Sequence, residues 1–353
     1  MPLDRSLTTV LDRLMDRSVA RVAGQDGCGP RAPLPRRSNS GYRGGMRAQQ
    51  YSRFGGSEVL ELVDDRPVPK TPPGYALVRV RAAGVNPVDW KVMAGGLDPI
   101  YDSVFPIVPG WDVAGVIEQL GADVPGFQVG DEVLAYARTA WIHHGTFAEL
   151  VPVPLEFLAH KPAELDWDQA GALPLAGLTA YQTLTRLGVD SGQTVLIHNA
   201  SGGVGSFAVQ IAQHLGAQVI GTASDRNHDR LKALGATPVN YGEGLAERVR
   251  EIAPGGVDVV LDLIGGVLDV TRAVLAPGGV HGSIADARFA AEGGLYAWVR
   301  PSGPQTNELA GLAATGVLHA DIAATHPLAG LPEAFEESRT GHIQGKIVIH
   351  PNE

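Results

Sequence analysis

Beyond Met46, short segments in which apolar and polar residues alternate fill the first part of the chain. Residues 76–85 (ALVRVRAAGV) alternate as a half-buried strand does, and residues 112–121 and 130–136 repeat the pattern. Glycine and proline stand between these segments, as in the PPG at 72–74. Many short strands separated by turn residues predict a partly open β-barrel.

The pattern changes after residue 165, where apolar residues recur at helical spacing up to Gly188. Short apolar strands then alternate with helices, which predicts a parallel sheet covered by helices on both faces. The strands are expected at 193–200, 217–224, 257–265, 274–284 and 295–301, and the helices at 203–216 and 227–235. A further helix (305–316) and a last strand (345–351) follow.

These patterns predict an α/β protein with a barrel domain and a doubly wound parallel-sheet domain. The barrel domain is expected to comprise residues 46–170, and the parallel-sheet domain residues 171–303. A length of 353 residues, with 44% hydrophobic and 19% charged residues, is typical of a globular protein with two domains.

Charge and cysteine content exclude several classes of partner and site. The formal net charge of −10 argues against nucleic acid as the main partner. The sequence has no run of about 18 apolar residues, so no membrane span is expected. The single cysteine, Cys28, excludes an internal disulfide and a cysteine-built zinc site, and it predicts a reducing, cytoplasmic setting.

Residues 1–45 differ in composition from the rest of the chain. They contain eight Arg, four Asp and no Lys or Glu, which gives a net charge of +4. Residues 24–45 are rich in Gly, Pro, Ser and Arg without periodicity, which predicts a disordered extension before the fold begins at Met46. An organelle transit peptide is the alternative, although such peptides are poor in acidic residues.

A glycine-rich turn follows the strand expected at 193–200. A dinucleotide-binding turn needs small residues because the chain turns tightly and the pyrophosphate lies against backbone N–H groups at a helix N-terminus. The pattern Gly203-x-Gly205-x-x-Ala208 would start the turn inside the helix, so Ala200-x-Gly202-x-x-Gly205 is preferred. A purely structural turn is the alternative. The cofactor contacts predicted here are Ala200, Ser201, Gly202, Gly203, Val204 and Gly205.

The residues after the next strand distinguish NAD from NADP. An Asp or Glu about 20 residues beyond the turn binds the ribose 2′-hydroxyl in NAD-dependent proteins. Here the sequence reads Ser224-Asp225-Arg226. If Asp225 faced the ribose the cofactor would be NAD, whereas Ser224 in that place leaves Arg226 to bind the 2′-phosphate of NADP. NADP(H) is predicted, and a solvated Arg226 is the alternative.

Seven segments carry motifs that point to one superfamily. They read AAGVNPVDWKV (82–92), FPIVPGWDVAGVI (105–117), GFQVGDEVLAY (126–136), GTFAELVPVP (145–154), AGALPLAGLTAYQTL (170–184), NASGGVGSFAVQIA (199–212) and TGHIQGKIV (340–348). Together they resemble the medium-chain dehydrogenase/reductase superfamily, and within it the zinc-free NADPH:quinone oxidoreductase (zeta-crystallin-like) branch. The resemblance implies a GroES-like barrel followed by a Rossmann domain, a C-terminal segment (residues 304–353) that returns to the barrel domain, and a homodimer.

The resemblance also bears on zinc. Zinc-dependent members have a cysteine ligand where Asn86 stands, and Gly-His-Glu where residues 110–112 read Gly-Trp-Asp. They also carry a four-cysteine lobe, for which this sequence has no cysteines. His143 and His144 are the nearest candidate ligands, but adjacent residues are expected to point apart, as a solvated loop pair. No metal site is predicted.

By the same resemblance, Asn86 and Asp89 line the nicotinamide pocket. Asn86 would bind the acceptor carbonyl or, alternatively, hold the turn before Pro87. Asp89 would anchor the loop or the nicotinamide ribose rather than act as a base. The other cofactor contacts that the resemblance implies are Thr179, Leu263, Ile264, Gly265, Ser283 and Lys346, the last of which would otherwise be a solvated lysine at a strand end.

Without a metal to polarise a carbonyl group, electron-poor acceptors are expected. The predicted reaction transfers a hydride from NADPH to a quinone or to the β-carbon of an enone, with a proton from solvent or Tyr101. Tyr101 is equally compatible with a partly buried aromatic at a domain edge. An enoyl-thioester reductase is one alternative, but Lys91, Arg138 and Arg300 form no cluster along the sequence. A non-enzymatic NADPH-binding protein is the other.

Overall fold

The computed structural model describes residues 45–341 and 343–352, so the predicted extension lies outside the described residues except for Gly45. The strands are β1 (Met46–Gln50), β2 (Glu61–Arg66), β3 (Tyr75–Val85), β4 (Asp102–Ser103), β5 (Asp112–Leu120), β6 (Glu132–Tyr136), β7 (Trp141–Ile142), β8 (Leu150–Pro154), β9 (Ala159–His160), β10 (Thr194–His198), β11 (Gln218–Ala223), β12 (Thr237–Asn240), β13 (Val257–Asp262), β14 (Leu275–Ser283), β15 (Leu295–Tyr296), β16 (Ile322–Pro327) and β17 (Lys346–His350). The α-helices are α2 (Pro87–Met93), α3 (Trp167–Ala172), α4 (Pro174–Arg186), α5 (Gly203–His214), α6 (His228–Ala233), α7 (Leu245–Ile252), α8 (Leu268–Val274), α9 (Arg288–Ala291), α10 (Gly303–Ala314) and α11 (Leu331–Arg339).

A strongly curved sheet forms the barrel. Its strands lie in the order β16-β17-β3-β5-β6-β9, and β8 also pairs with β3. Alternation along β3 explains the core, because Val78, Val80 and Ala82 are fully buried while Arg79 and Arg81 between them are not. The predicted barrel is confirmed.

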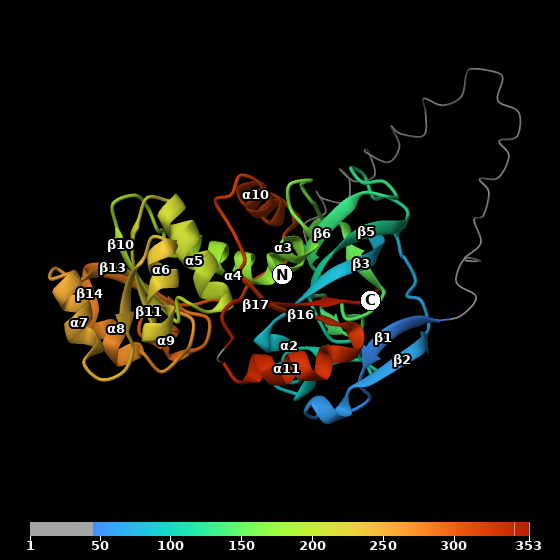
Figure 1. Ribbon diagram of the computed structural model, residues 1–353, viewed down its shortest axis with the longest axis horizontal. Helices are drawn as coiled ribbons and strands as arrows, with labels where there is room; N and C mark the ends of the chain where they lie inside the picture. Colours follow the sequence, from blue (N-terminus) through green and yellow to red (C-terminus); the bar gives the residue numbers. More distant parts are fainter. Residues whose placement is uncertain (1–44, 342, 353) are drawn as a thin grey trace, which may run out of the picture. The chain divides into compact units, whose positions relative to one another are not determined.

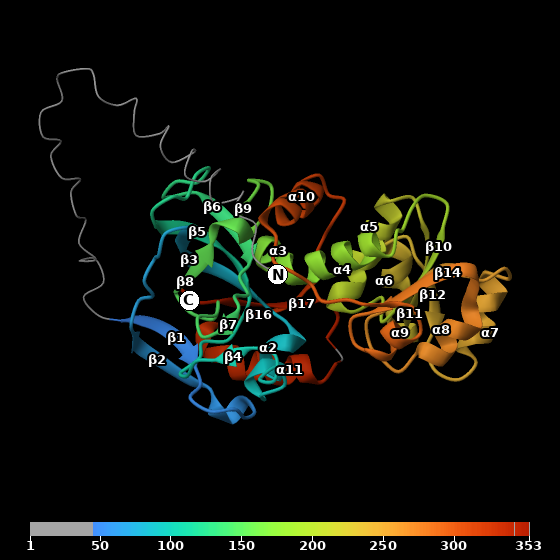
Figure 2. The same ribbon diagram turned by 180° about the vertical axis from the view of Figure 1, so that it is seen from behind.

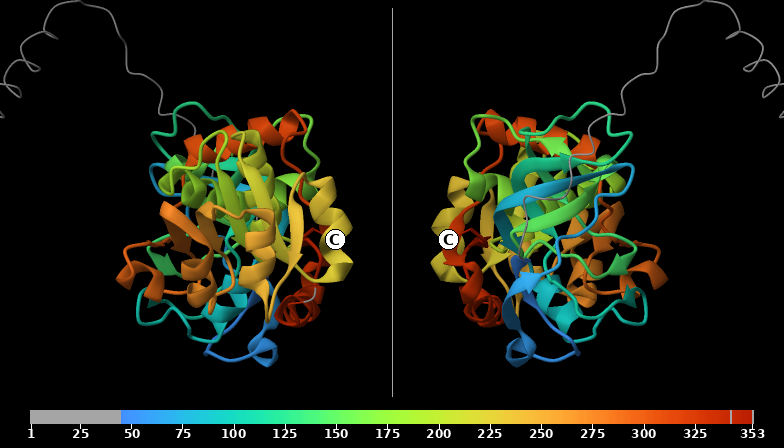
Figure 3. Two further views of the ribbon diagram at one scale, coloured as in Figure 1. Left: turned by 90° about the vertical axis from the view of Figure 1, so that its left-hand side faces the viewer. Right: turned by 90° about the vertical axis from the view of Figure 1, so that its right-hand side faces the viewer.

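A six-stranded parallel sheet forms the centre of the second domain, and its strands lie in the order β12-β11-β10-β13-β14-β15. Strands β10, β11 and β13 are buried on both faces. In β10, Val195 and Ile197 pack in the same core cluster as Phe207 of α5, whereas Leu196 belongs to the cluster that contains Val249 of α7. Helices therefore cover both sides of the strands, as the left panel of Figure 3 shows. This confirms the predicted doubly wound arrangement.

The C-terminal segment joins the barrel. Strand β17 pairs antiparallel with β3 through Ile347–Val85 and Ile349–Ala83, and β16 pairs with β17. Figures 1 and 2 show β16 and β17 beside β3, with the helices of the parallel sheet on the other side of α4. The exact boundaries at residues 170 and 303 stay predictions.

Two sequence predictions need correction. The helix expected up to Gly188 is two helices, α3 and α4, because Pro174 cannot continue a helix but suits the first position of a new one. The strand expected at 295–301 is ordered as a strand only over Leu295–Tyr296. Among the described residues, no helix has the length and apolar character needed to cross a membrane.

Candidate active site

The glycine-rich turn connects β10 to α5 where the preferred pattern places it. β10 ends at His198, Gly202 is the N-cap of α5, and the helix begins at Gly203. Asn199 has a φ of 57°, which lets the chain reverse directly after the strand. The first N–H groups of α5 have no partner within the helix, so they are available to an anion.

Gly205 allows the helix to pack closely on the turn. A Cβ atom at this position would lie 2.2 Å from the Asn199 carbonyl oxygen and 2.6 Å from that of Ala200. No side chain fits at such distances. Ala200 itself is fully buried and donates its N–H to the Thr222 carbonyl, which fixes the turn to the neighbouring strand.

A cavity of about 750 Å³ opens in front of this turn. Its basic lining residues are Lys91, Arg138, Arg226 and Lys346, and among the residues that the structure describes no Asp or Glu lines it. The chain as a whole is acidic, with a net charge of −10. A concave site with this lining favours an anionic ligand.

The structure brings part of the predicted site to this cavity. The predicted residues that line it are Asn86, Thr179, Ser201, Gly202, Gly203, Val204, Gly205, Arg226, Leu263, Ile264 and Lys346. Those that do not are Asp89, Tyr101, Ala200, Ser224, Gly265 and Ser283.

Asn86, Asp112 and Lys346 form a buried polar cluster. The Asn86 Nδ2 donates to Asp112 Oδ2 (2.8 Å), and its Oδ1 accepts from Lys346 Nζ (2.5 Å). Lys346 Nζ also donates to the Val85 carbonyl (3.1 Å) and lies 3.7 Å from Asp112 Oδ2. Lys346 is thus a buried member of the site and not a solvated lysine.

Asp112 connects the barrel to α4. Its Oδ1 accepts the backbone N–H of Leu175 (2.7 Å), one of the N-terminal N–H groups of α4. Burial raises the pKa of Asp112 to about 6, although Lys346 and Asn86 favour the ionised form. Burial lowers the pKa of Lys346, and Asp112 opposes that effect. Asp112 and Lys346 therefore each favour the ionised form of the other.

Asp89 holds the start of α2. Its Oδ2 accepts the backbone N–H of Asn86 (2.8 Å), while Asn86 presents its side chain to the cavity. Asp89 is buried, and its Oδ1 has no hydrogen-bond partner among the described residues. Burial raises the pKa of Asp89 to about 8. The anchoring role predicted for Asp89 fits this geometry.

The pKa of Asp89 predicts a pH-dependent stability. The folded chain keeps a proton on Asp89 up to about pH 8, whereas an ordinary carboxyl ionises near the value of 3.8. Because the folded state binds more protons in this range, the free energy of unfolding falls as the pH rises from 6 to 8. Asp89→Asn, which keeps an acceptor for the Asn86 N–H, is expected to weaken that decline. Urea unfolding at both pH values measures it, and equal declines in the two proteins would contradict the assignment.

The segment after β11 places Arg226 at the cavity. Strand β11 was predicted to end at Ser224, but it ends one residue earlier, at Ala223. Ser224 is the N-cap residue of the short 3-10 helix η3 (Asp225–Asn227). Asp225 Oδ1 accepts a hydrogen bond from Asn240 Nδ2 (2.6 Å). Asp225 does not line the cavity. Arg226 and Asn227 do.

The loops after β13 and β14 both reach the cavity. Only some of the residues that line it there are those predicted to contact the cofactor. Asp262 Oδ1 accepts the N–H groups of Ile264 and Gly265, which shapes the turn predicted to contact the cofactor. Ser283 is fully buried and donates to Asp262 Oδ2 (2.7 Å), so it supports the loop from behind. The adjacent Ile284 and Ala285 line the cavity.

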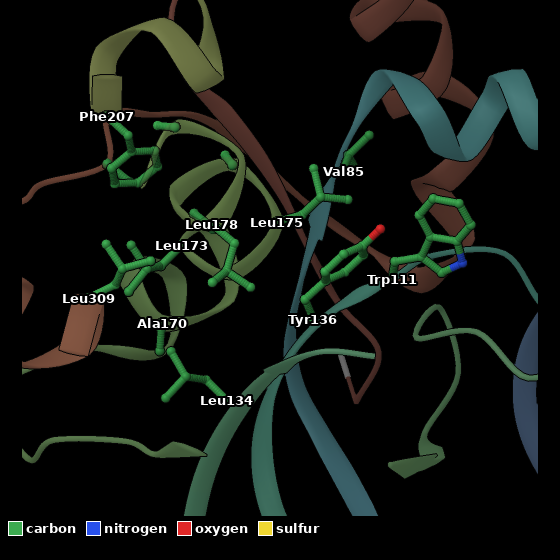
Figure 4. Packing of buried hydrophobic residues seen from close by; sticks show 14 of the residues in the cluster. Val85, Trp111, Leu134, Tyr136, Ala170, Leu173, Leu175, Leu178, Phe207 and Leu309 are labelled. Carbon is green, nitrogen blue, oxygen red and sulfur yellow. The ribbon is translucent and has the colours of Figure 1, made fainter. Parts of the chain in front are cut away.

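The Tyr101 hydroxyl accepts a hydrogen bond from the Arg138 guanidinium. Two tyrosines that the sequence analysis did not single out line the cavity: Tyr136, the last residue of β6, and Tyr296 of β15. Tyr136 is the one bonded to Arg138. In Figure 4 its ring lies near Leu175, and the hydroxyl points toward the side on which Trp111 lies. Tyr136 and Arg138 are two residues apart at the end of a strand. In a strand this spacing places both side chains on the same face of the sheet, which is how the sequence could have identified them.

The histidine pair differs from its prediction. The rings of His143 and His144 do not point apart but lie with their centroids 4.1 Å from each other. His144 is partly buried, and desolvation lowers its pKa to about 4. His143 Nδ1 lies 2.6 Å from the Val104 carbonyl oxygen. Within residues 45–341 and 343–352, no three His, Cys, Asp or Glu side chains form a metal-binding group, and the absence of zinc stays a prediction.

Comparison with known proteins places this architecture in a family. The alcohol dehydrogenase GroES-like domain matches residues 72–163, and the zinc-binding dehydrogenase domain matches residues 234–349. The chain is 33% identical over 315 residues to the NADPH-dependent alkenal/one oxidoreductase, chloroplastic, of Arabidopsis thaliana, covering 87% of this chain and 80% of that protein. The chain belongs to the medium-chain dehydrogenase/reductase superfamily.

Two further members of this superfamily are similar over most of their length. A chloroplastic quinone oxidoreductase of Triphysaria versicolor is 31% identical and covers 87% of this chain and 98% of its own. The solved quinone oxidoreductase of Coxiella burnetii has a TM-score of 0.77 and 33% identity, and covers 86% of this chain and 99% of its own. The family predicted from the sequence motifs is confirmed.

Proposed function

We propose that the chain is an NADPH-dependent oxidoreductase that transfers a hydride to a quinone or to the C=C bond of an α,β-unsaturated carbonyl compound. The observation that carries the proposal is the cavity that four basic side chains and the glycine-rich turn line, without an acidic residue among its described lining. The family relatives named as alkenal/one and quinone oxidoreductases support the reaction class.

The residues present fit NADPH. The N-terminal N–H groups of α5 would hold the pyrophosphate, and Gly205 keeps α5 packed closely on the turn that presents them. Thr179, Leu263 and Ile264 line the same cavity and would contact the nicotinamide end. When bound, NADPH supplies the hydride. The protein positions the acceptor and excludes water.

Arg226 supports NADPH over NADH. It lines the cavity just after β11, whereas the neighbouring Asp225 accepts a hydrogen bond from Asn240 and does not line it. A ribose 2′-hydroxyl would need the acidic side chain there, while a 2′-phosphate needs the guanidinium.

Arg226→Gln is expected to weaken NADPH binding by about 10- to 100-fold, the loss of a charge-assisted hydrogen bond of about 1.5–3 kcal/mol. NADH lacks the 2′-phosphate, so its affinity is expected to stay within about twofold. Titration of NADPH and NADH by protein fluorescence measures both constants. An unchanged NADPH affinity would remove Arg226 from the assignment.

The other part of the cavity suits an apolar acceptor. Leu97, Ile100, Trp111 and Val299 line it together with Asn86. Quinones and enones are flat, uncharged and accept a hydride readily, so they match such a lining. Purified protein with NADPH and a panel of quinones and enones tests the proposal, and the absence of acceptor-dependent NADPH oxidation would refute it.

We also propose that the enzyme is a cytoplasmic homodimer. A single cysteine is compatible with a reducing compartment, and the dimer follows the family expectation of contacts along the Rossmann sheet edge. Strands β12 and β15 are the edges of that sheet, and Trp298 is exposed just beyond β15. Light scattering and cell fractionation test the two statements separately.

A further inference from the structure

Arg138 occupies a fixed position between two tyrosines at the cavity. Its Nε donates to the Tyr136 hydroxyl (2.8 Å), its Nη1 donates to the Tyr101 hydroxyl, and its Nη2 lies 3.4 Å from the Val299 carbonyl oxygen. The guanidinium carbon is also 5.1 Å from the Tyr101 ring centroid and 5.6 Å from that of Tyr136. These contacts restrain the guanidinium on several sides.

The guanidinium retains unused donors. Arginine has five N–H groups, and the described contacts use three of them, which leaves one N–H on each terminal nitrogen. No Asp or Glu among the described residues forms a salt bridge with Arg138. A half-buried cation that lines a cavity without a carboxylate partner favours a ligand oxygen with negative charge.

The other basic residues that line the cavity differ from Arg138 in position or in the groups that they contact. Arg226 lies beyond the end of β11, beside the glycine-rich turn. The Lys346 ammonium is already bound to Asn86 and to the Val85 carbonyl. Lys91 lies against the Trp90 ring, 5.4 Å from its centroid. Arg138 is the lining cation surrounded by aromatic side chains.

Tyr136 adds a second polar group at the same place. Its hydroxyl accepts the Arg138 N–H, and it lines the cavity beside Trp111, whose ring centroid is 6.0 Å away. Burial raises the pKa of Tyr136, so the hydroxyl stays neutral and can donate a hydrogen bond. Arg138 and Tyr136 thus present N–H and O–H donors to an otherwise apolar wall.

We propose that Arg138 is a catalytic residue that binds the carbonyl oxygen of the acceptor and stabilises the oxyanion formed during reduction. Tyr101 and Tyr136 are positioning residues that hold its guanidinium. The inference rests on the proposed function and defines the acceptor class: an apolar compound with an oxygen that gains negative charge upon reduction. Such stabilisation is effective because the donors are already oriented before the reaction.

The proposed reaction conserves atoms and electrons with either acceptor. An enone that accepts a hydride gains a C–H bond at its β-carbon, and its C=C electron pair moves to give an enolate with a negative oxygen. One proton from solvent then bonds to the α-carbon, and the saturated carbonyl compound leaves. A quinone becomes a hydroquinone monoanion and takes one proton on oxygen. In each case NADPH is oxidised to NADP⁺ and the acceptor is reduced by two electrons.

Arg138→Gln tests the inference through turnover and through a spectroscopic readout. The kcat/KM for an enone is expected to fall by about 100- to 1,000-fold, as for loss of an oxyanion donor, while the Kd for NADPH stays within about twofold. The second readout is 4-hydroxybenzaldehyde bound in the presence of NADP⁺, whose phenolate absorbance reports its pKa. Wild type is expected to lower that pKa by at least about one unit relative to Arg138→Gln.

Controls separate a local effect from misfolding. Arg186→Gln makes the same chemical change at an exposed position at the end of α4, and is expected to match wild type in every readout. Arg138→Lys keeps the charge without the planar fork, so an intermediate kcat/KM is expected. The thermal midpoint of each variant shows whether it is folded, and the NADPH Kd shows whether the cofactor site is intact.

The outcomes distinguish this inference from the proposed function. If wild type reduces enones with NADPH but Arg138→Gln keeps its kcat/KM and the same phenol pKa, Arg138 does not bind the acceptor oxygen, and the proposed function stands. If wild type binds no NADPH and reduces no acceptor, both are wrong. Loss of turnover together with loss of the pKa shift, at unchanged NADPH affinity, supports the inference.

Discussion

Asp112→Asn is expected to lower the free energy of unfolding by about 3–5 kcal/mol at neutral pH, the typical cost of removing one member of a buried ion pair. Asp112 is fully buried and accepts hydrogen bonds from Asn86 and from the Leu175 N–H at the start of α4. An asparagine amide would place a donor against a donor on one side, and would leave Lys346 without its carboxylate.

Urea unfolding measures this loss, and Asp269→Asn serves as the matched control. Asp269 is 97% exposed and pairs with Arg272 one helical turn away, so its replacement is expected to cost less than about 1 kcal/mol. Adding Lys346→Met to Asp112→Asn is expected to restore part of the stability, because no buried charge then lacks a partner. A change below about 1 kcal/mol for Asp112→Asn alone would contradict the role assigned to the cluster.

Gly205→Ala is expected to lower the free energy of unfolding by about 1–3 kcal/mol and to weaken NADPH binding at least about tenfold. Alanine normally stabilises a helix relative to glycine, so the expected sign is the opposite of the helix-propensity effect. The reason is the 2.2 Å distance between the added Cβ and the Asn199 carbonyl oxygen, which would push α5 away from the turn. The N–H groups at the start of α5 would then move away from the pyrophosphate.

Gly311→Ala in α10 isolates this packing effect. An added Cβ at Gly311 meets no atom within 4 Å, so the variant is expected to be about 0.5–1 kcal/mol more stable than wild type. Thermal or urea unfolding compares the two variants, and fluorescence titration gives the NADPH affinity. Equal effects of the two substitutions would mean that the close approach at Gly205 is not required.

The sequence predicted many elements of the fold because local patterns determine them, but it did not predict β12, β16, α7, α8 or α11. The strand at 193–200 followed by small residues identified the turn at Ala200, Gly202 and Gly205, and the structure begins α5 at Gly203. The two-residue period in β3 and the apolar strands of the parallel sheet were equally visible. Pro174 in the sequence also indicates the break between α3 and α4. It was missed because apolar residues keep helical spacing on both sides of it.

The connections across the site depend on tertiary contacts that no local pattern contains. Asn86 meets Asp112 from 26 positions away and Lys346 from 260 positions away. Arg138 meets Tyr101 from 37 positions away. The basic residues that seemed scattered along the sequence include two that line the cavity, Lys91 and Arg138. The adjacent histidines were misjudged because adjacent residues in a loop do not follow the alternation of a strand.

The central claim is hydride transfer to an electron-poor acceptor, and the most direct test is the fate of a labelled hydride. NADPH that carries deuterium at the transferred C4 position is incubated with the protein and an enone, and the product is analysed by mass spectrometry and NMR. We expect one deuterium per product molecule, located on the β-carbon. A product without deuterium, deuterium on the carbonyl carbon, or no consumption of NADPH would contradict the claim.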